Sequence, residues 1–155
     1  MNKVTGFTLI ELMIVLVILS ILLLVALPAY QSSVIKSNRS AGRGILQDVV
    51  ARQEQYFINN KTYADTLEKL GYGVDGADAF YVNKLVDRYP SATGDAVYQI
   101  GVNLISTLNY EVTALPKGLQ LKDDRCQGFR ITENGVKTNV DASDTAAPGS
   151  LDECW

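Results

Sequence analysis

Two cysteines, Cys126 and Cys154, are the only thiols in this sequence, and they bracket a polar stretch near its end. Such a pair can form a disulfide, which suits an oxidising compartment, or it can remain as two unrelated reduced thiols. The sequence contains no histidine. Imidazole general bases, Ser-His and Cys-His nucleophile pairs and histidine-ligated metal sites are therefore excluded, and most common enzyme designs with them.

Acidic residues around and between the cysteines form a second group that could do chemistry. Their carboxylates could supply oxygen ligands for calcium, but their spacing does not match the D-x-[DN]-x-[DN]-G pattern of a known calcium loop. We interpret them as solvated loop carboxylates, and we expect no metal and no cofactor. The group consists of Asp123, Asp124, Asp141, Asp144, Asp152 and Glu153.

Four basic residues, Lys36, Arg39, Arg43 and Arg52, could contact DNA or lipid headgroups. We interpret them instead as charges on the solvent-exposed side of a helix. The whole chain has 14 basic and 17 acidic residues, which gives a formal net charge of -3. This balance lacks the clustered basic surface that would favour nucleic acid as the main partner.

Residues 12–29 form an apolar segment, LMIVLVILSILLLVALPA, that contains no charged residue. About 20 such residues are needed to cross the hydrocarbon core as a helix, so the segment predicts a membrane helix. A cleaved secretory signal is the alternative. It fits poorly, because Leu27 and Ala29 would flank the cut and a small-x-small site is required there.

Two arguments about the orientation of this segment disagree. Lys36, Arg39 and Arg43 follow it whereas Lys3 alone precedes it, so the positive-inside rule would place the downstream part in the cytoplasm. The cysteine pair favours the opposite, oxidising side.

The helix is expected to continue beyond the apolar segment to about residue 60, because apolar residues recur there at spacings of four and seven. Pro28 predicts a kink or local unwinding, with a helix end at the membrane surface as the alternative. Gly42 and Gly44 each cost about 1 kcal/mol relative to alanine in a helix.

Beyond an irregular region over 59–95, with one short helix expected at 64–70, the hydrophobic period changes to two. Residues 98–104 and 108–114 alternate as antiparallel strands do, and 129–131 and 136–140 flank an Asn-Gly pair that favours a tight hairpin. The sequence therefore predicts an α+β head in which a four-stranded antiparallel sheet packs on the long helix.

The first part of the chain, KVTGFTLIELMIVLVILSILLLVALPAYQ at 3–31, resembles the N-terminus of type IV pilins and of type II secretion pseudopilins. The resemblance implies that Gly6 is the last leader residue, that Phe7 is the N-methylated start of the mature chain, and that Glu11 is the glutamate that meets the terminal amine of a neighbouring subunit. It divides the chain into a leader (1–6), a membrane and filament-core helix (7–30) and an amphipathic helix with the pilin head (31–155).

Two further stretches extend the resemblance. A loop bounded by Cys126 and Cys154 looks like the D-region of type IVa pilins, which implies a disulfide between them. ArgGlnGluGlnTyrPhe at 52–57, with the residues that follow to 72, is similar to one group of minor pilins.

The resemblance implies a structural, minor subunit of a type IV pilus and not an enzyme. Its partners would be a prepilin peptidase and methyltransferase, the pilus assembly platform and other pilin subunits. The precursor would sit in the bacterial inner membrane with its head in the periplasm, and the surface pilus would serve twitching motility, adhesion or DNA uptake. The alternatives are a secretion pseudopilin and a membrane-anchored adhesive or DNA-binding module.

Overall fold

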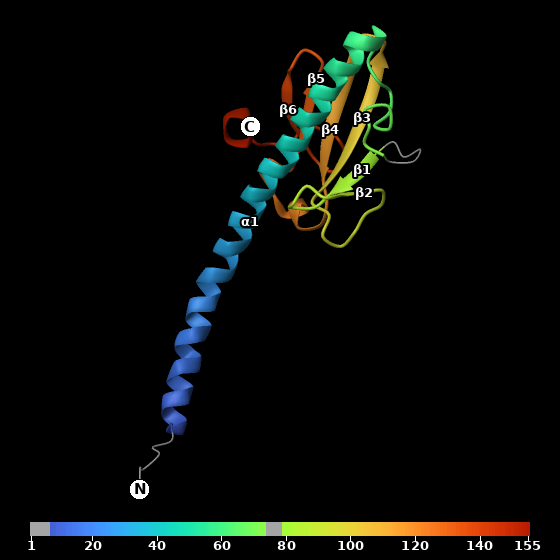
Figure 1. Ribbon diagram of the computed structural model, residues 1–155. Helices are drawn as coiled ribbons and strands as arrows, with labels where there is room; N and C mark the ends of the chain where they lie inside the picture. Colours follow the sequence, from blue (N-terminus) through green and yellow to red (C-terminus); the bar gives the residue numbers. More distant parts are fainter. Residues whose placement is uncertain (1–6, 74–78) are drawn as a thin grey trace. The chain divides into compact units, whose positions relative to one another are not determined.

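The computed structural model describes residues 7–73 and 79–155 of the chain. Contacts divide the chain into two compact units, Met1–Val34 and Ile35–Trp155, and we call the second unit the head. Helix α1, Leu9–Asn60, contributes to both units (Figure 1). Its observed end at Asn60 confirms the expected extent of the amphipathic continuation.

The helical assignment of α1 continues through Pro28, so the helix neither ends nor unwinds at this residue. Proline has no N–H, which leaves the carbonyl of Leu24 without its usual intrahelical donor. A bend at Pro28 stays a prediction.

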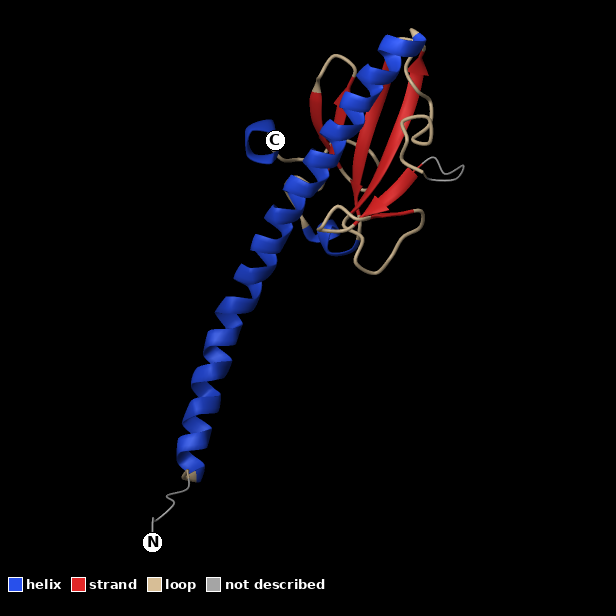
Figure 2. Ribbon diagram, in the orientation of Figure 1, coloured by secondary structure: helices blue, strands red, loops and turns tan. Residues whose placement is uncertain are grey.

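Among the described residues, six strands form one antiparallel sheet in the order β2-β1-β3-β4-β5-β6 (Figure 2). The strands are β1 (Ala79–Val82), β2 (Arg88–Tyr89), β3 (Tyr98–Ser106), β4 (Asn109–Pro116), β5 (Gly128–Thr132) and β6 (Lys137–Val140). A 3-10 helix, η1 (Gly118–Lys122), follows β4, and a short helix, α2 (Leu151–Cys154), follows the last loop.

The α+β class is confirmed, but the expected number of four strands is wrong. The four predicted strands are β3 to β6, and the sequence analysis missed β1 and β2 at the sheet edge. These strands have four and two residues, too few to show a period of two, and β1 is formed by pairing with the long β3. The helix expected at 64–70 is also wrong, because bends and turns occupy that stretch.

The core of the head lies between α1 and the sheet, with Leu46 and Val49 on the helix side and Phe80, Tyr98 and Phe129 on the sheet side, all fully buried. Gly42 is part of this packing. A Cβ atom at this position would lie 2.7 Å from Cε2 of Tyr98, so the helix can approach the ring only where it carries a glycine.

Candidate functional site

The described part of the chain begins at Phe7, whose side chain is 85% exposed, and α1 starts two residues later. Thr8 caps the helix, because its Oγ1 accepts a hydrogen bond from the N–H of Glu11 at 3.3 Å. Glu11 is therefore the third residue of the helix, where the macrodipole favours a negative charge. Gly6, the expected last leader residue, lies outside the described residues.

From Phe7 onward, nearly every large apolar side chain of the first unit is exposed. Exposure ranges from 46% at Leu23 to 77% at Leu9 along the apolar part of α1. By length and composition this helix can cross a membrane, with a mean hydropathy of 3.1 over an 18-residue window of which no residue is buried. A surface of this kind requires a bilayer or neighbouring apolar helices.

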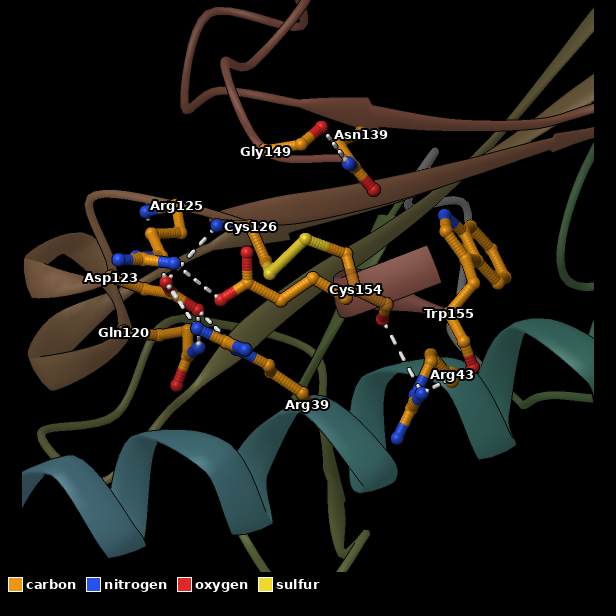
Figure 3. Close-up of a disulfide and its surroundings, with 11 residues drawn as sticks. Arg39, Arg43, Gln120, Asp123, Arg125, Cys126, Asn139, Gly149, Cys154 and Trp155 are labelled. Carbon is orange, nitrogen blue, oxygen red and sulfur yellow. Dashed lines mark hydrogen bonds and ion pairs between the residues drawn. A yellow bond between two sulfur atoms is a disulfide. The ribbon is translucent and has the colours of Figure 1, made fainter. Parts of the chain in front are cut away.

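The second candidate region is the disulfide clasp, which we define as Cys126, Cys154, Asp123, Arg39 and Arg43 (Figure 3). The disulfide joins Cys126 and Cys154, as the resemblance implied, and both residues are fully buried. It closes the segment that carries β5, β6 and α2.

Arg39 of α1 forms a bidentate ion pair with Asp123, at the end of η1. Its Nε and Nη2 atoms both lie 2.8 Å from the carboxylate oxygens, and the side chains are only 11% and 1% exposed. Three more groups donate to the same carboxylate, namely Gln120 Nε2 at 3.0 Å and the N–H groups of Arg125 and Cys126 at 3.2 and 3.1 Å. The pair thus fixes one half of the disulfide to the helix.

Arg43, one turn further along α1, holds the other half. Its Nη1 donates to the backbone oxygens of Cys154 at 3.3 Å and of Trp155 at 2.5 Å. The Trp155 ring packs edge-on against Phe129 with centroids 5.2 Å apart. Two arginines on one face of α1 therefore bind the two ends of the disulfide loop (Figure 3).

Gly149 allows the loop to close against the disulfide. A Cβ atom there would lie 2.2 Å from the backbone oxygen of Arg125 and 2.8 Å from Sγ of Cys154, so only glycine fits. The amide of Asn139 in β6 donates to the Gly149 oxygen at 2.7 Å and holds this turn on the sheet (Figure 3).

The clasp controls the charge state of Asp123. Burial raises the pKa of this carboxyl, but the hydrogen bonds from Arg39 and from the Cys126 N–H outweigh burial, and the pKa lies below its ordinary value. The hydrogen bond to Asp123 likewise raises the pKa of Arg39. Both groups are therefore charged at neutral pH, and each compensates the other in a mostly buried position.

The interpretation of the helix cations as solvent-exposed charges is wrong for two of them. Arg39 and Arg43 point into the clasp. Arg52 is only partly exposed: it donates to Asp48 and to the Leu70 oxygen, the latter at 3.0 Å, and its guanidinium lies 4.6 Å from the centroid of the Tyr72 ring. Lys36 alone of the four is exposed. The clasp partners of Arg39 and Arg43 lie far away in the sequence, up to 112 residues for Arg43 and Trp155, so the sequence pattern of the helix does not reveal them.

The acidic residues also differ from the expectation in part. Asp123 is buried, whereas Asp124, Asp152 and Glu153 are exposed, as predicted. Asp141 binds its own loop through the N–H groups of Ser143 and Thr145. Among the described residues, no three potential ligands lie close enough to hold a metal ion.

The segment that resembles minor pilins anchors the chain after α1. Gln53 is fully buried, and its amide exchanges two hydrogen bonds with the backbone of Ala64 at 2.9 and 2.8 Å. Phe57 stacks on Tyr63 with centroids 4.7 Å apart, and Tyr63 contacts the ring of Tyr110 in β4. The motif therefore has a local structural role, which its sequence did not reveal.

Sequence reasoning missed Thr8, Asp123 as a partner of Arg39, and Gly149. The pattern Thr8-x-x-Glu11 is a capping box and could have identified the helix start. No sequence signal connects Arg39 to Asp123, because a pair 84 residues apart is defined by the sheet topology alone.

Comparisons with known proteins match both the N-terminal helix and the head of this chain. A family model described as "Type IV minor pilin ComP, DNA uptake sequence receptor" matches residues 28–130, and a model of the prokaryotic N-terminal methylation motif matches residues 1–27. A fimbrial protein of Moraxella nonliquefaciens is 29% identical over 143 residues, which cover 91% of this chain and 93% of that protein. Fimbrial protein EcpC of Eikenella corrodens is 32% identical over 117 residues, covering 76% of this chain and 69% of that protein. A solved type IV pilin of Shewanella oneidensis has a TM-score of 0.42 and 11% identity, covering 77% of this chain and 97% of that one.

Proposed function

The chain belongs to the type IV minor pilin family, and from this premise we propose that it is a low-copy pilus subunit, cleaved between Gly6 and Phe7 and assembled through its apolar helix. Type IV pilins assemble with other pilin subunits, and two relatives of this chain are named as major components of type IV pili. The methylation motif implies a prepilin peptidase, and the apolar N-terminal helix implies a membrane-anchored precursor of a surface pilus.

The exposed apolar surface of α1 is the observation that carries the assembly proposal. Side chains from Leu9 to Leu27 are about half or more exposed in the single chain. In the precursor the bilayer covers this surface, and in a filament the helices of neighbouring subunits would cover it instead.

Glu11 would set the register of assembly. Cleavage after Gly6 creates a new amine at Phe7, four residues before Glu11. In an apolar filament core the carboxylate of one subunit and the amine of another attract strongly and satisfy each other.

The disulfide supports a periplasmic position of the head in the precursor. Cytosolic thiols are kept reduced, whereas the Cys126–Cys154 bond is part of a buried clasp on which the loop packs. This compartment argument favours the orientation opposite to the one given by the positive-inside count.

Assembly is tested by shearing filaments from cells and identifying this chain in them. We expect the chain, starting at methylated Phe7, in the filament fraction at far lower abundance than the main pilin, and a deletion strain with fewer filaments. Recovery in a purified secretion pseudopilus instead would overturn the assignment to a pilus.

DNA uptake is a second candidate function, favoured by the family model that spans 28–130. Arg39 and Arg43 are occupied within the clasp, so DNA would have to contact other cations of the head. The test is a titration of the detergent-solubilised chain with duplexes of different sequence at several salt concentrations. Binding with a sequence preference would support a receptor role, and absence of binding at low salt would exclude it.

A further inference from the structure

A basic and apolar rim closes one end of the head, where β1 and β4 both finish. We define the rim as the turn after β1 together with η1. Its exposed members are Lys84, Leu85, Val86, Asp87, Gly118, Leu121 and Lys122. Arg88, the first residue of β2, is exposed beside the rim, and its guanidinium lies 5.4 Å from the centroid of the Tyr72 ring.

The two parts of the rim are neighbours because of the strand register. Val82 at the end of β1 pairs with Tyr98, and Tyr98 pairs with Pro116 at the end of β4. Two more hydrogen bonds of 2.8 Å, donated by Val97 N–H to the Val82 oxygen and by Lys117 N–H to the Val97 oxygen, extend this pairing. The ends of β1 and β4 therefore lie on either side of the start of β3 (Figure 1).

The rim combines exposed apolar groups with positive charge. The side chains of Leu85 and Leu121 are 71% and 54% exposed although both lie in polar turns. More than half of each side chain is open to solvent, and each leucine is next to a lysine in the sequence, Lys84 or Lys122. Exposed apolar groups beside cations are typical of surfaces that bind the membrane interface.

The charge of this end differs in sign from that of the whole chain. Its cations are Lys36, Lys84, Arg88, Lys117 and Lys122, and its acids outside ion pairs are Asp87, Asp95 and Asp124. Two of these acids bind within the loop, because Asn83 Nδ2 donates to Asp87 at 3.0 Å and to Asp95 at 3.2 Å. The five cations outnumber the three acids, so this end of the head is net positive on a chain of formal charge -3.

The chain connection limits the distance between this end of the head and the apolar segment. Arg39 of α1 pairs with Asp123 directly after η1, so Lys36 lies one helical turn from the rim. The apolar segment ends at Ala29, and the seven residues from there to Lys36 span about 10 Å as helix and at most about 25 Å when extended. The rim is thus held within reach of the headgroups.

From these observations we propose that the rim binds an anionic bilayer surface in the membrane-anchored precursor. The rim lysines and Arg88 contact lipid phosphates, and Leu85 and Leu121 insert between the headgroups. The contact restrains the head before assembly and is broken when the subunit leaves the membrane. It goes beyond the proposed role in the filament and requires only the membrane anchor.

The test uses the full chain in vesicles of phosphatidylcholine alone or of phosphatidylcholine mixed with phosphatidylglycerol at roughly 7:3. Each lysine near an anionic surface strengthens binding to it roughly five-fold. Acetylation rates of individual lysines are measured by mass spectrometry. We expect Lys84 and Lys122 to react about three-fold or more slowly in the anionic vesicles, with recovery in about 1 M salt. Lys61, exposed at the far end of α1, is the internal control and should not change.

One double variant tests the apolar contribution to binding. Leu85→Ser with Leu121→Ser should reduce the protection of both lysines, while an unchanged fluorescence spectrum of Trp155, which packs on Phe129, shows that the head is folded. Equal rates of Lys84 and Lys122 in the two vesicle types would overturn the proposal. Protection by a DNA duplex in phosphatidylcholine vesicles, without protection by anionic lipid, would also overturn it and assign the rim to nucleic acid.

Discussion

Replacement of Arg39 by methionine tests whether the clasp holds the disulfide loop on the helix. The substitution keeps an aliphatic side chain but removes the guanidinium that pairs with Asp123, whose side chain is 1% exposed. Loss of one partner from a buried ion pair costs about 3 to 5 kcal/mol. Because Gln120 and two backbone N–H groups still donate to Asp123, we expect a loss of about 2 to 3 kcal/mol in the free energy of unfolding.

Arg125→Met is the matched control in the same loop. Arg125 pairs with Glu153, but the two side chains are 70% and 41% exposed, so its removal should cost less than about 1 kcal/mol. Both variants can be unfolded in urea as full chains in detergent, with the fluorescence of Trp155, the only tryptophan, as the signal. This residue packs on Phe129 and adjoins Cys154, so it reports on the clasp directly.

The difference between the variants depends on pH in a defined direction. The folded-state pKa of Asp123 lies below its unfolded value, so the pair stabilises the fold above about pH 4 and this contribution is lost as pH falls through the folded pKa. The penalty of Arg39→Met should therefore shrink below about pH 4, where a protonated Asp123 needs no cation. Equal unfolding free energies of the two variants at neutral pH would show that the Arg39–Asp123 pair does not stabilise the head more than an exposed ion pair does.

The remaining predictions concern assembly, the disulfide and the helix packing. Glu11→Val should leave cleavage and membrane abundance unchanged but impair entry into sheared filaments, with Glu11→Asp milder; wild-type incorporation of the Val variant would show that Glu11 only sits at the interface. Cys126→Ser with Cys154→Ser should lower head stability by about 3 to 4 kcal/mol and reduce filament incorporation; two free thiols in native protein would contradict the pairing. Gly42→Ala should destabilise the head by about 1 to 3 kcal/mol, because the new Cβ meets the Tyr98 ring. Gly44→Ala should stabilise the head by up to about 1 kcal/mol, because there is open space around Gly44. Changes of the same sign in the unfolding free energy of both variants would contradict the packing.

Periodic elements were predictable from the sequence because their repeats extend over many residues. The long helix and β3 to β6 follow from spacings of four and two, and the turn at Asn134-Gly135 formed as expected, with Gly135 at a positive φ of 73°. The residues alone leave Cys126 and Cys154 either paired or as two reduced thiols, and only the resemblance to pilins favours the pair. The structure contains the disulfide.

Tertiary contacts were not predictable, because residues of one type have different surroundings in the fold. Gly42 and Gly44 have the same helix propensity, yet only Gly42 lies under the Tyr98 ring. Arg39 and Lys36 are both cations of one amphipathic helix, and only the position of η1 decides that Arg39 is buried. Short strands such as β2 depend on their neighbours for pairing and carry no periodic signal of their own.

The role as a minor pilus subunit is tested most directly by quantitative mass spectrometry of sheared, purified filaments. We expect a peptide that starts at N-methylated Phe7, present in the filaments at a small fraction of the abundance of the main pilin. Absence of this chain from filaments of cells that express and process it, or its recovery as the dominant subunit, would rule out a minor pilus subunit.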